Sequence, residues 1–307
     1  MASSSSAAEG RASPIAGLWM ERPGCAQLGL LACGCASLRV EKGNVDLADF
    51  RALPHLGTSL NEDCELDVAL ADDRDAAVEA QQLAALVGRP GPLRVIELFA
   101  GGGYHGRALA ALGHEAHYIE SSAAMKRYMV EEVGLPAQRY HLARLPSWPM
   151  AATPPFDLVV LARFSADYLA PAELDALATR LATVLRPGGV WAVELQDRRS
   201  VANGHRDLGI RVRETTLPGR RAVLEFPDAE VLVEPARGDR PPVLWQSLSL
   251  TVTGPTGTET SRYAHWEYFY DRADLESVPA IAEHFDVLDV DVSAAFPQST
   301  LVPLRRR

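Results

Sequence analysis

The sequence VIELFAGGG, at residues 95–103, carries the clearest structural signal in this chain. Its apolar first half, interrupted by Glu97, is typical of a short buried strand. Three glycines follow directly, before a helical pattern. A turn without Cβ atoms lets a ligand approach the main chain, and in an open parallel sheet the ligand lies beyond the carboxyl ends of the strands. The stretch therefore predicts a strand, a ligand-binding turn and a helix.

Strand and helix patterns alternate around this turn, with short connections. The alternation predicts an α/β fold with a Rossmann-like, doubly wound and mostly parallel sheet. The continuous apolar run FDLVVLA, at 156–162, fits a strand that helices cover on both faces. We expect strands at 93–99, 115–120, 138–143, 156–162 and 189–195, and helices at 73–87, 104–112, 171–185 and from Ser121 or Ser122 to Val133.

The regular alternation stops after residue 196. Several β-like runs joined by Gly and Pro turns predict an antiparallel β insertion over residues 197–270. A helix is then expected at 272–285. Strands at 286–292 and 300–304 are close enough to form a C-terminal antiparallel hairpin at one edge of the sheet.

An acid follows the glycine-rich turn at an informative distance. Glu120 ends the second expected strand, near the roughly 20-residue offset at which an acid meets a ribose in nucleotide-binding α/β folds. Gly101, Gly103 and Gly106 also match the spacing of a dinucleotide loop, so NAD stays an alternative, as does a tight turn without a ligand. Glu97 favours a different nucleotide, because its carboxylate repels a pyrophosphate and attracts an ammonium group.

Composition excludes several classes of protein. The 307 residues carry a formal net charge of -10, which repels phosphate backbones, so we expect no nucleic-acid partner. No apolar run reaches the roughly 18–20 residues of a membrane span, and four Cys are too few for a disulfide-stapled domain. We expect a cytoplasmic protein with no bound metal, in which residues 1–44, with Cys33 and Cys35 as unliganded thiols, form a flexible leader before a domain at 45–307.

Together these segments resemble the class I S-adenosylmethionine-dependent methyltransferases, over roughly residues 75–307. The motifs that carry the resemblance are ELFAGGG at 97–103 (the cofactor loop), YIES at 118–121 (the ribose acid), FDLVVLARFSADYL at 156–169 (the fourth strand), LRPGGVWAVEL at 185–195 (the fifth strand), and DLESVPAIAEHFDVLDVDV at 274–292 with STLVPLRRR at 299–307 (the closing helix and hairpin).

The resemblance implies how the cofactor is held. Glu97 and the main chain of the glycines would bind its amino-acid part, Glu120 its ribose, and Met125 would lie near its adenine. Two positions depart from the family pattern. Phe99 stands where the loop has its first Gly, and residues 142–144 offer no acid for the adenine. The expected cofactor-binding residues are Glu97, Phe99, Ala100, Gly101, Gly102, Gly103, Glu120, Ser121, Met125, Ala143, Arg144, Ala162 and Arg163.

Candidates for the chemistry follow from the reaction. Methyl transfer from a sulfonium is an in-line displacement, which needs a base only if the acceptor arrives protonated or is a poor nucleophile. His265, in the aromatic end of the insertion, is the candidate base, and Tyr168 is a second candidate because aromatic faces suit a sulfonium. Packing in a strand core is the other interpretation of the aromatic cluster. His105 is expected to be neutral at a helix N-terminus, and Glu194 either reaches the acceptor or is a buried structural acid. The expected substrate-binding residues are Tyr104, Phe164, Gln196 and Tyr263.

The function that the resemblance implies is methyl transfer from S-adenosylmethionine to an amine or hydroxyl of a small metabolite. The insertion is similar in placement to that of glycine, sarcosine and amino-sugar N-methyltransferases, where it builds a lid or a homodimer contact. Three alternatives stay open: a cyclase that consumes the cofactor and releases methylthioadenosine, a non-catalytic binding protein with this fold, and an NAD-linked oxidoreductase.

Overall fold

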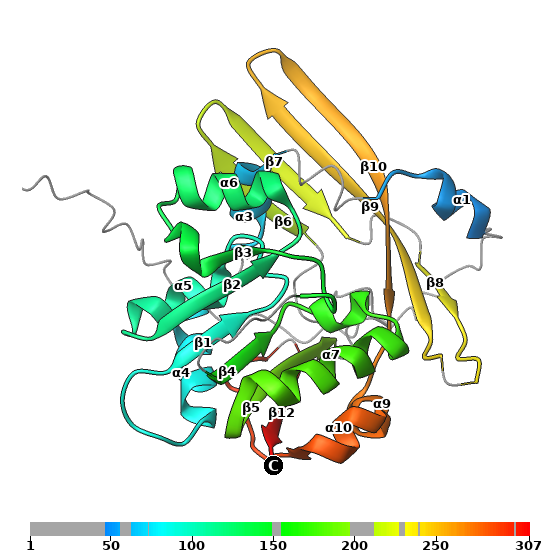
Figure 1. Ribbon diagram of the computed structural model, residues 1–307. Coiled ribbons are helices and arrows are strands. Elements are labelled where there is room, and N and C mark those ends of the chain that lie inside the picture. The colour runs from blue at the N-terminus through cyan, green and yellow to red at the C-terminus, as the bar shows by residue number, and fades with distance from the viewer. Residues whose placement is uncertain are drawn as a thin grey trace, which may run out of the picture. The chain divides into compact units, whose positions relative to one another are not determined.

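Seven strands form a central sheet in the computed structural model, in the order β11-β12-β5-β4-β1-β2-β3 (Figure 1). Strands β3, β2, β1, β4 and β5 pair in parallel, whereas β12 is antiparallel to both of its neighbours. This arrangement confirms the Rossmann-like, mostly parallel sheet with its C-terminal antiparallel hairpin. The bounds are β1 Arg94–Glu97, β2 Glu115–Glu120, β3 Tyr140–Leu142, β4 Phe156–Leu161, β5 Leu185–Gln196, β11 Phe285–Val287 and β12 Ser299–Arg306.

The structure describes residues 47–55, 63–72, 74–148, 155–196, 212–226, 231–238, 240–297 and 299–307. They all belong to one unit, Asn44–Arg307. The expected leader, with Cys33 and Cys35, lies outside the described residues. No helix within these ranges combines the length and the apolar character that a membrane crossing requires.

Helices cover both faces of the central sheet. Along β4, Leu158 and Val160 pack in the core with α4, Ala76–Leu86, while Val159 and Leu161 pack in the core with α7, Pro171–Val184. A strand buried on both faces reads as a continuous apolar run, which explains the sequence of β4. The remaining helices on the sheet are α5 Tyr104–Ala111, α6 Ala123–Glu131, α9 Arg272–Ser277 and α10 Pro279–His284.

The strand order reverses beside β1. The chain leaves β1 toward β2 on one side, and β4 lies on its other side. In a doubly wound sheet a ligand binds at the carboxyl ends of the strands on either side of this switch point. The glycine-rich turn after β1 and the turn after β4 therefore meet at the expected site.

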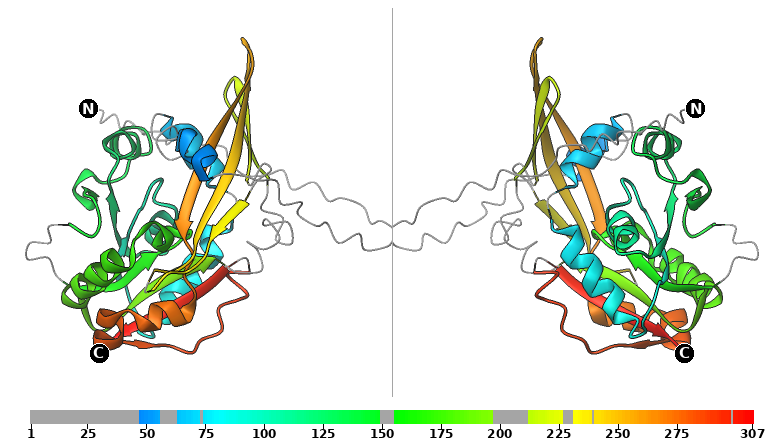
Figure 2. Two further views of the ribbon diagram at one scale, coloured as in Figure 1. Left: turned by 90° about the vertical axis from the view of Figure 1, so that its right-hand side faces the viewer. Right: turned by 90° about the vertical axis from the view of Figure 1, so that its left-hand side faces the viewer.

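A second, antiparallel sheet follows β5 in the chain, as the fold prediction stated. Its order is β10-β9-β7-β6, and β8 pairs with β9. Figure 2 shows β9 and β10 as a long hairpin beside the central sheet, and Trp245 pairs with Trp266 across it. The bounds are β6 Val212–Leu217, β7 Arg220–Glu225, β8 Val231–Glu234, β9 Val243–Gly254 and β10 Gly257–Tyr268.

Four elements differ from the sequence prediction. The helix expected at 272–285 is two helices, because Pro279 starts α10 after Val278 has adopted an extended conformation. The strand expected at 286–292 is only the short β11. Two helices were not predicted, α1 Leu47–Ala52 and α3 Cys64–Leu70, and α3 packs Leu66 and Leu70 against the second sheet.

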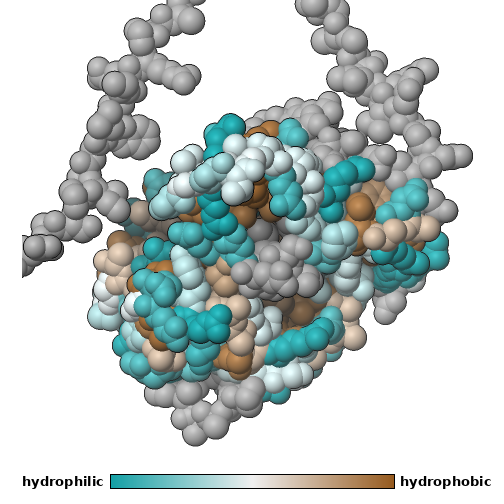
Figure 3. All heavy atoms as spheres, turned by 90° about the horizontal axis from the view of Figure 1, so that it is seen from above, coloured by the Kyte–Doolittle hydropathy of each residue, from teal (hydrophilic) through white to brown (hydrophobic). Residues whose placement is uncertain are grey.

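Hydrophilic residues dominate the described surface in the view from above, and brown apolar residues lie mostly in recesses between them (Figure 3). This distribution is typical of a chain whose large apolar side chains are buried in a core.

Candidate functional site

The turn after β1 has a left-handed backbone at three positions. Gly101 and Gly103 have φ values of 47° and 63°, and Phe99 has a φ of 50°. A Cβ added to Gly101 would meet nothing within 4 Å, whereas one added to Gly102 would lie 2.8 Å from Cγ2 of Val68 on α3. The turn is therefore open at Gly101 and in close contact with α3 at Gly102.

Glu97, at the end of β1, binds the start of α5. Its carboxylate accepts hydrogen bonds from the main-chain N–H of His105 at 3.1 Å and of Gly106 at 2.8 Å. These bonds satisfy N–H groups at the helix start that Gly103, which has no side chain, leaves without a cap. A Cβ at Gly106 would approach Oε2 of Glu97 to 3.0 Å, so this contact requires a glycine.

Glu120, at the end of β2, is held by three main-chain N–H groups. Its carboxylate accepts from Gly101 at 3.0 Å, Ser121 at 2.7 Å and Ser122 at 2.8 Å. The bond to Gly101 joins the acid directly to the glycine-rich turn. Each carboxylate oxygen can accept more than one bond, so Glu120 keeps acceptor capacity for the hydroxyls of a ribose.

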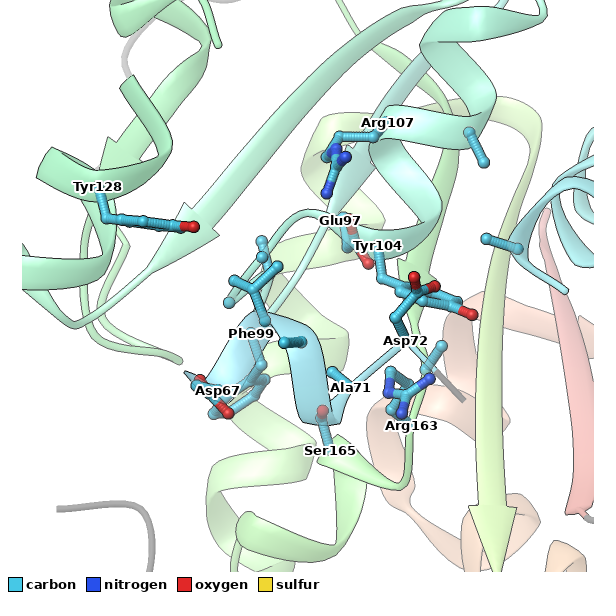
Figure 4. A pocket seen from close by; sticks show the side chains of 18 of the residues that line it. Asp67, Ala71, Asp72, Glu97, Phe99, Tyr104, Arg107, Tyr128, Arg163 and Ser165 are labelled. Carbon is cyan, nitrogen blue, oxygen red and sulfur yellow. The ribbon is translucent and has the colours of Figure 1, made fainter. Parts of the chain in front are cut away.

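Two cavities lie at this edge of the sheet, and they contain most of the expected cofactor-binding residues. The first has a volume of about 770 Å³ and is drawn in Figure 4; the second has about 630 Å³. Only Phe99 and Tyr168 line both cavities. Among the expected residues, the first cavity is lined by Glu97, Phe99, Ala100, Gly101, Gly102, Ala162 and Arg163, and the second by Phe99, Glu120, Ser121, Ala143 and Arg144.

These residues fit S-adenosylmethionine. The open turn at Gly101 borders the first cavity, and Glu120, the acid expected to bind the ribose, borders the second. Two expected residues line neither cavity. Met125 is buried in the core beneath α6, and Gly103 packs against Tyr118.

His105 differs from the neutral state expected of it. Its Nε2 lies 2.7 Å from Oε2 of Glu79, and its Nδ1 lies 3.3 Å from Oε1 of Glu97. Burial alone would lower the pKa of His105, but the hydrogen bonds and charges of the two glutamates raise it overall. This direction is opposite to the one expected for a histidine at a helix N-terminus, because the two carboxylates favour the charged form of the ring.

The same chain of charges continues across the switch point. Glu79 pairs with Nε of Arg74 at 2.6 Å, and NH1 of Arg74 pairs with Glu194 at 2.7 Å. Glu194 also accepts from the main-chain N–H of Arg163 at 2.7 Å and from Oγ of Ser299 at 2.6 Å. Burial would raise the pKa of Glu194, but Arg74 and these donors lower it overall. Glu194 is thus a buried structural acid that fixes the turn after β4.

The expected substrate-binding residues after the glycines and after β4 lie near the first cavity. The guanidinium of Arg163 lies 4.7 Å from the ring centroid of Tyr104, and the Tyr104 hydroxyl donates to the main-chain oxygen of Arg74. Phe164 follows Arg163 in a second left-handed conformation and begins the 3₁₀ helix η2, Ser165–Tyr168. This turn places Tyr168 opposite Phe99, with ring centroids 6.3 Å apart.

His265, the candidate base, contacts residues that line the second cavity. Its ring centroid lies 5.6 Å from that of Tyr168 and 5.9 Å from that of His55. Its Nε2 lies 3.1 Å from Oε2 of Glu267, a side chain that is only 3% exposed. Neither His265 nor Glu267 lines the first or the second cavity, so His265 contacts the site through Tyr168.

Two expected substrate-binding residues have other surroundings. Gln196, only 5% exposed, donates through Nε2 to Glu267, which also accepts from Gln246 at 3.1 Å. Tyr263 packs beside the apolar core between α3 and the second sheet. The alternating sequence pattern predicts which face of a strand a side chain occupies, but it does not predict which elements pack on that face.

Sequence reasoning missed an acidic wall of the first cavity. Asp67 on α3 and Asp72 after it point into the cavity, as does Arg107 from α5 (Figure 4). Burial and the charge of Glu120 raise the pKa of Asp67 to about 6. The available signal was Asp63 before CELDVAL, an N-cap followed by acids in a first turn.

Comparisons with known proteins agree with this geometry. Residues 95–189 match a family model described as a methyltransferase domain. No curated protein matches the chain by sequence.

Solved structures share the fold. The sugar N-methyltransferase KedS8 from Streptoalloteichus is 20% identical over 91% of this chain and 100% of its own, with a TM-score of 0.61. DesVI from Streptomyces venezuelae is 21% identical over 86% and 99%, with a TM-score of 0.59. CalS10, an amino pentose methyltransferase from Micromonospora echinaspora, is 18% identical over 76% and 93%, with a TM-score of 0.56. Residues 95–189 thus form a methyltransferase domain, and the whole described chain shares the fold of these methyltransferases.

Proposed function

We propose that this enzyme methylates the amine of a small metabolite and that an amino sugar is its substrate. S-adenosylmethionine supplies the reaction with a methyl group activated by a positive sulfur. The residues of the chain then have to bind the acceptor, align it and take up its proton. Two of the similar structures are named as a sugar N-methyltransferase and an amino pentose methyltransferase.

The acidic wall of the first cavity is the observation that favours an amine over a hydroxyl as the acceptor. Glu65, Asp67 and Asp72 line it from one segment of the chain, opposite the glycine-rich turn. On the other side, Arg163 already stacks on Tyr104. A cavity lined by carboxylates attracts cationic groups, both the ammonium of the cofactor and that of an acceptor amine, and offers little to a neutral hydroxyl.

An amine that arrives as an ammonium must lose a proton before it attacks the methyl group. We assign this proton to His265, which lies against Tyr168 at the boundary of the two cavities. Glu267 is a positioning residue in this scheme, because its carboxylate orients the imidazole through Nε2. Gln196 and Gln246 hold the same carboxylate in place.

Product analysis tests the proposal. The enzyme is incubated with S-adenosylmethionine and matched pairs of amino sugars and their hydroxyl counterparts, and both products are measured by mass spectrometry. We expect S-adenosylhomocysteine and a methylated amino sugar in equal amounts. Methylation of the hydroxyl member alone would overturn the choice of an amine, and methylthioadenosine without a methylated sugar would indicate the cyclase.

Two expectations about the setting of the enzyme stay predictions. One is a cytoplasmic location, and the other is a homodimer contact through the β-rich insertion at 197–270. Light scattering after gel filtration tests the second: a monomer at micromolar concentration would contradict it.

A further inference from the structure

Phe99 occupies a position whose backbone favours glycine. Its φ of 50° lies in the left-handed region, which is sterically costly for a side chain with a Cβ. Among the described residues, the non-glycine positions with such a φ are Phe99, Arg163 and Phe164, all at the carboxyl ends of β1 and β4. Strained backbone of this kind clusters at functional sites, so the side chain of Phe99 calls for a functional explanation.

The position of Phe99 between the two cavities suggests what its side chain does. Among the described residues, only Phe99 and Tyr168 line both cavities, and their ring centroids lie 6.3 Å apart with the ring planes tilted by 44°. The methionine part of the cofactor belongs beside the glycine-rich turn in the first cavity, and the ribose belongs beside Glu120 in the second. The atom that joins these two parts is the sulfonium sulfur. A cofactor bound in this way carries its sulfur past Phe99 and Tyr168.

We propose that Phe99 and Tyr168 form an aromatic clamp on the sulfonium, which makes the site prefer S-adenosylmethionine over S-adenosylhomocysteine. The two nucleosides differ by one methyl group and one positive charge at the sulfur. An aromatic face attracts a cation within about 6 Å and gains no such energy from a neutral thioether. The clamp thereby favours release of the product after transfer. The inference rests on the proposed use of the cofactor as a methyl donor.

The surroundings of the pair fit a cation. Asp67 points into the cavity that Phe99 lines (Figure 4), and its charge acts on Tyr168. The ring of His265 meets that of Tyr168 edge-on at an interplanar angle of 90°, which restricts the orientation of the tyrosine. The clamp therefore combines two ring faces with a nearby carboxylate.

Calorimetry with both nucleosides tests the clamp without any methyl acceptor. The measured quantity is the ratio of the two dissociation constants for the wild type, Phe99→Leu, Phe99→Gly, Tyr168→Leu and Tyr168→Phe. We expect Phe99→Leu, Phe99→Gly and Tyr168→Leu to lower the preference for S-adenosylmethionine about five- to thirtyfold, mainly by weakening its binding. Tyr168→Phe keeps the ring and should keep the ratio. Tyr128→Leu is the matched control, because Tyr128 lines only the first cavity.

The outcomes separate the clamp from simpler roles. Phe99→Gly tightening both nucleosides equally would show that the ring obstructs the site, and equal weakening of both in the leucine variants would show a purely structural role; either result overturns the clamp. Methylation of an amino sugar with an unchanged ratio would overturn the clamp alone. Failure of the wild type to bind either nucleoside would overturn the proposed function as well.

Discussion

His105 is buried between two carboxylates of different origin, Glu79 from α4 and Glu97 from β1. Glu79 also pairs with Arg74, and Glu97 accepts from two main-chain N–H groups, so His105 completes a network in which each buried carboxylate has several partners. The imidazole ring therefore joins α4 to the strand that precedes the glycine-rich turn.

Replacing this histidine should destabilise the fold. We expect His105→Ala to lower the free energy of unfolding by about 3–5 kcal/mol, because it removes one partner from each of two buried carboxylates. The folded-state pKa of His105 is raised, so its contribution is complete below the unfolded value of about 6.5 and is lost as the pH rises through the folded-state pKa. Urea unfolding between pH 6 and 9 measures both effects. His284→Ala, at a partly exposed position, is the control. A variant with the same pH dependence as the wild type would contradict the prediction.

Helix α3 packs against the glycine-rich turn through a close contact between Val68 and Gly102. The Cβ of a residue at 102 would lie 2.8 Å from Cγ2 of Val68, which is next to Asp67. The glycine-rich turn and the acidic wall are therefore positioned against each other.

An alanine at this contact should push the two elements apart. We expect Gly102→Ala to lower the free energy of unfolding by about 1–2 kcal/mol and to weaken cofactor binding about tenfold. Adding Val68→Ala makes room for the new methyl group, so the double variant should recover most of the binding lost. Calorimetry and urea unfolding of the four proteins in the cycle measure the coupling. Additive effects would contradict the contact.

Sequence reasoning predicted the central elements well because residues within or beside each element mark where it begins and ends. Strand β2 has the predicted bounds, 115–120, and Ser122 caps α6 as one of two expected candidates. Helix α3 was missed because seven residues give too little periodicity, and its position depends on packing against β6 and α6. The state of His105 was missed for a similar reason, since Glu79 is distant in sequence and only the fold brings it near.

The cofactor side of the site was accessible from the sequence because a turn and an acid at fixed spacing define it. The acceptor side was not, because it depends on how the second sheet meets the first. Gln196 and Glu267 come from different sheets and meet in a buried contact, which no local pattern predicts.

On the scale of the whole molecule, Glu267 joins the two sheets. It accepts from Gln196 on β5 and Gln246 on β9, and it faces His265 on its own strand. Asp167, fully enclosed nearby, has its pKa raised by burial and by the charge of Glu267. The raised pKa favours the neutral form of Asp167, so the negative charge beside the candidate base is that of Glu267.

Neutralising the junction should alter catalysis more than folding. The imidazole of His265 lies against Glu267, His55 and Tyr168. Glu267→Gln removes the carboxylate that orients the imidazole of His265, so we expect kcat to fall about tenfold or more. Glu259→Gln, at an exposed position on the same strand, is the control. An unchanged kcat, with circular dichroism like that of the wild type, would contradict the role of the pair.

The antiparallel pairing of β12 with β5 joins Gln196 to Ser299, about one hundred residues apart. All five strands of the second sheet lie within that interval. Long-range pairing of this kind is slow because the entropy of closing the loop must be lost before any contact forms. We therefore expect refolding kinetics to be governed by the insertion: the parallel half assembles early, and the last strand waits until β6–β10 have condensed and shortened the effective path between its ends.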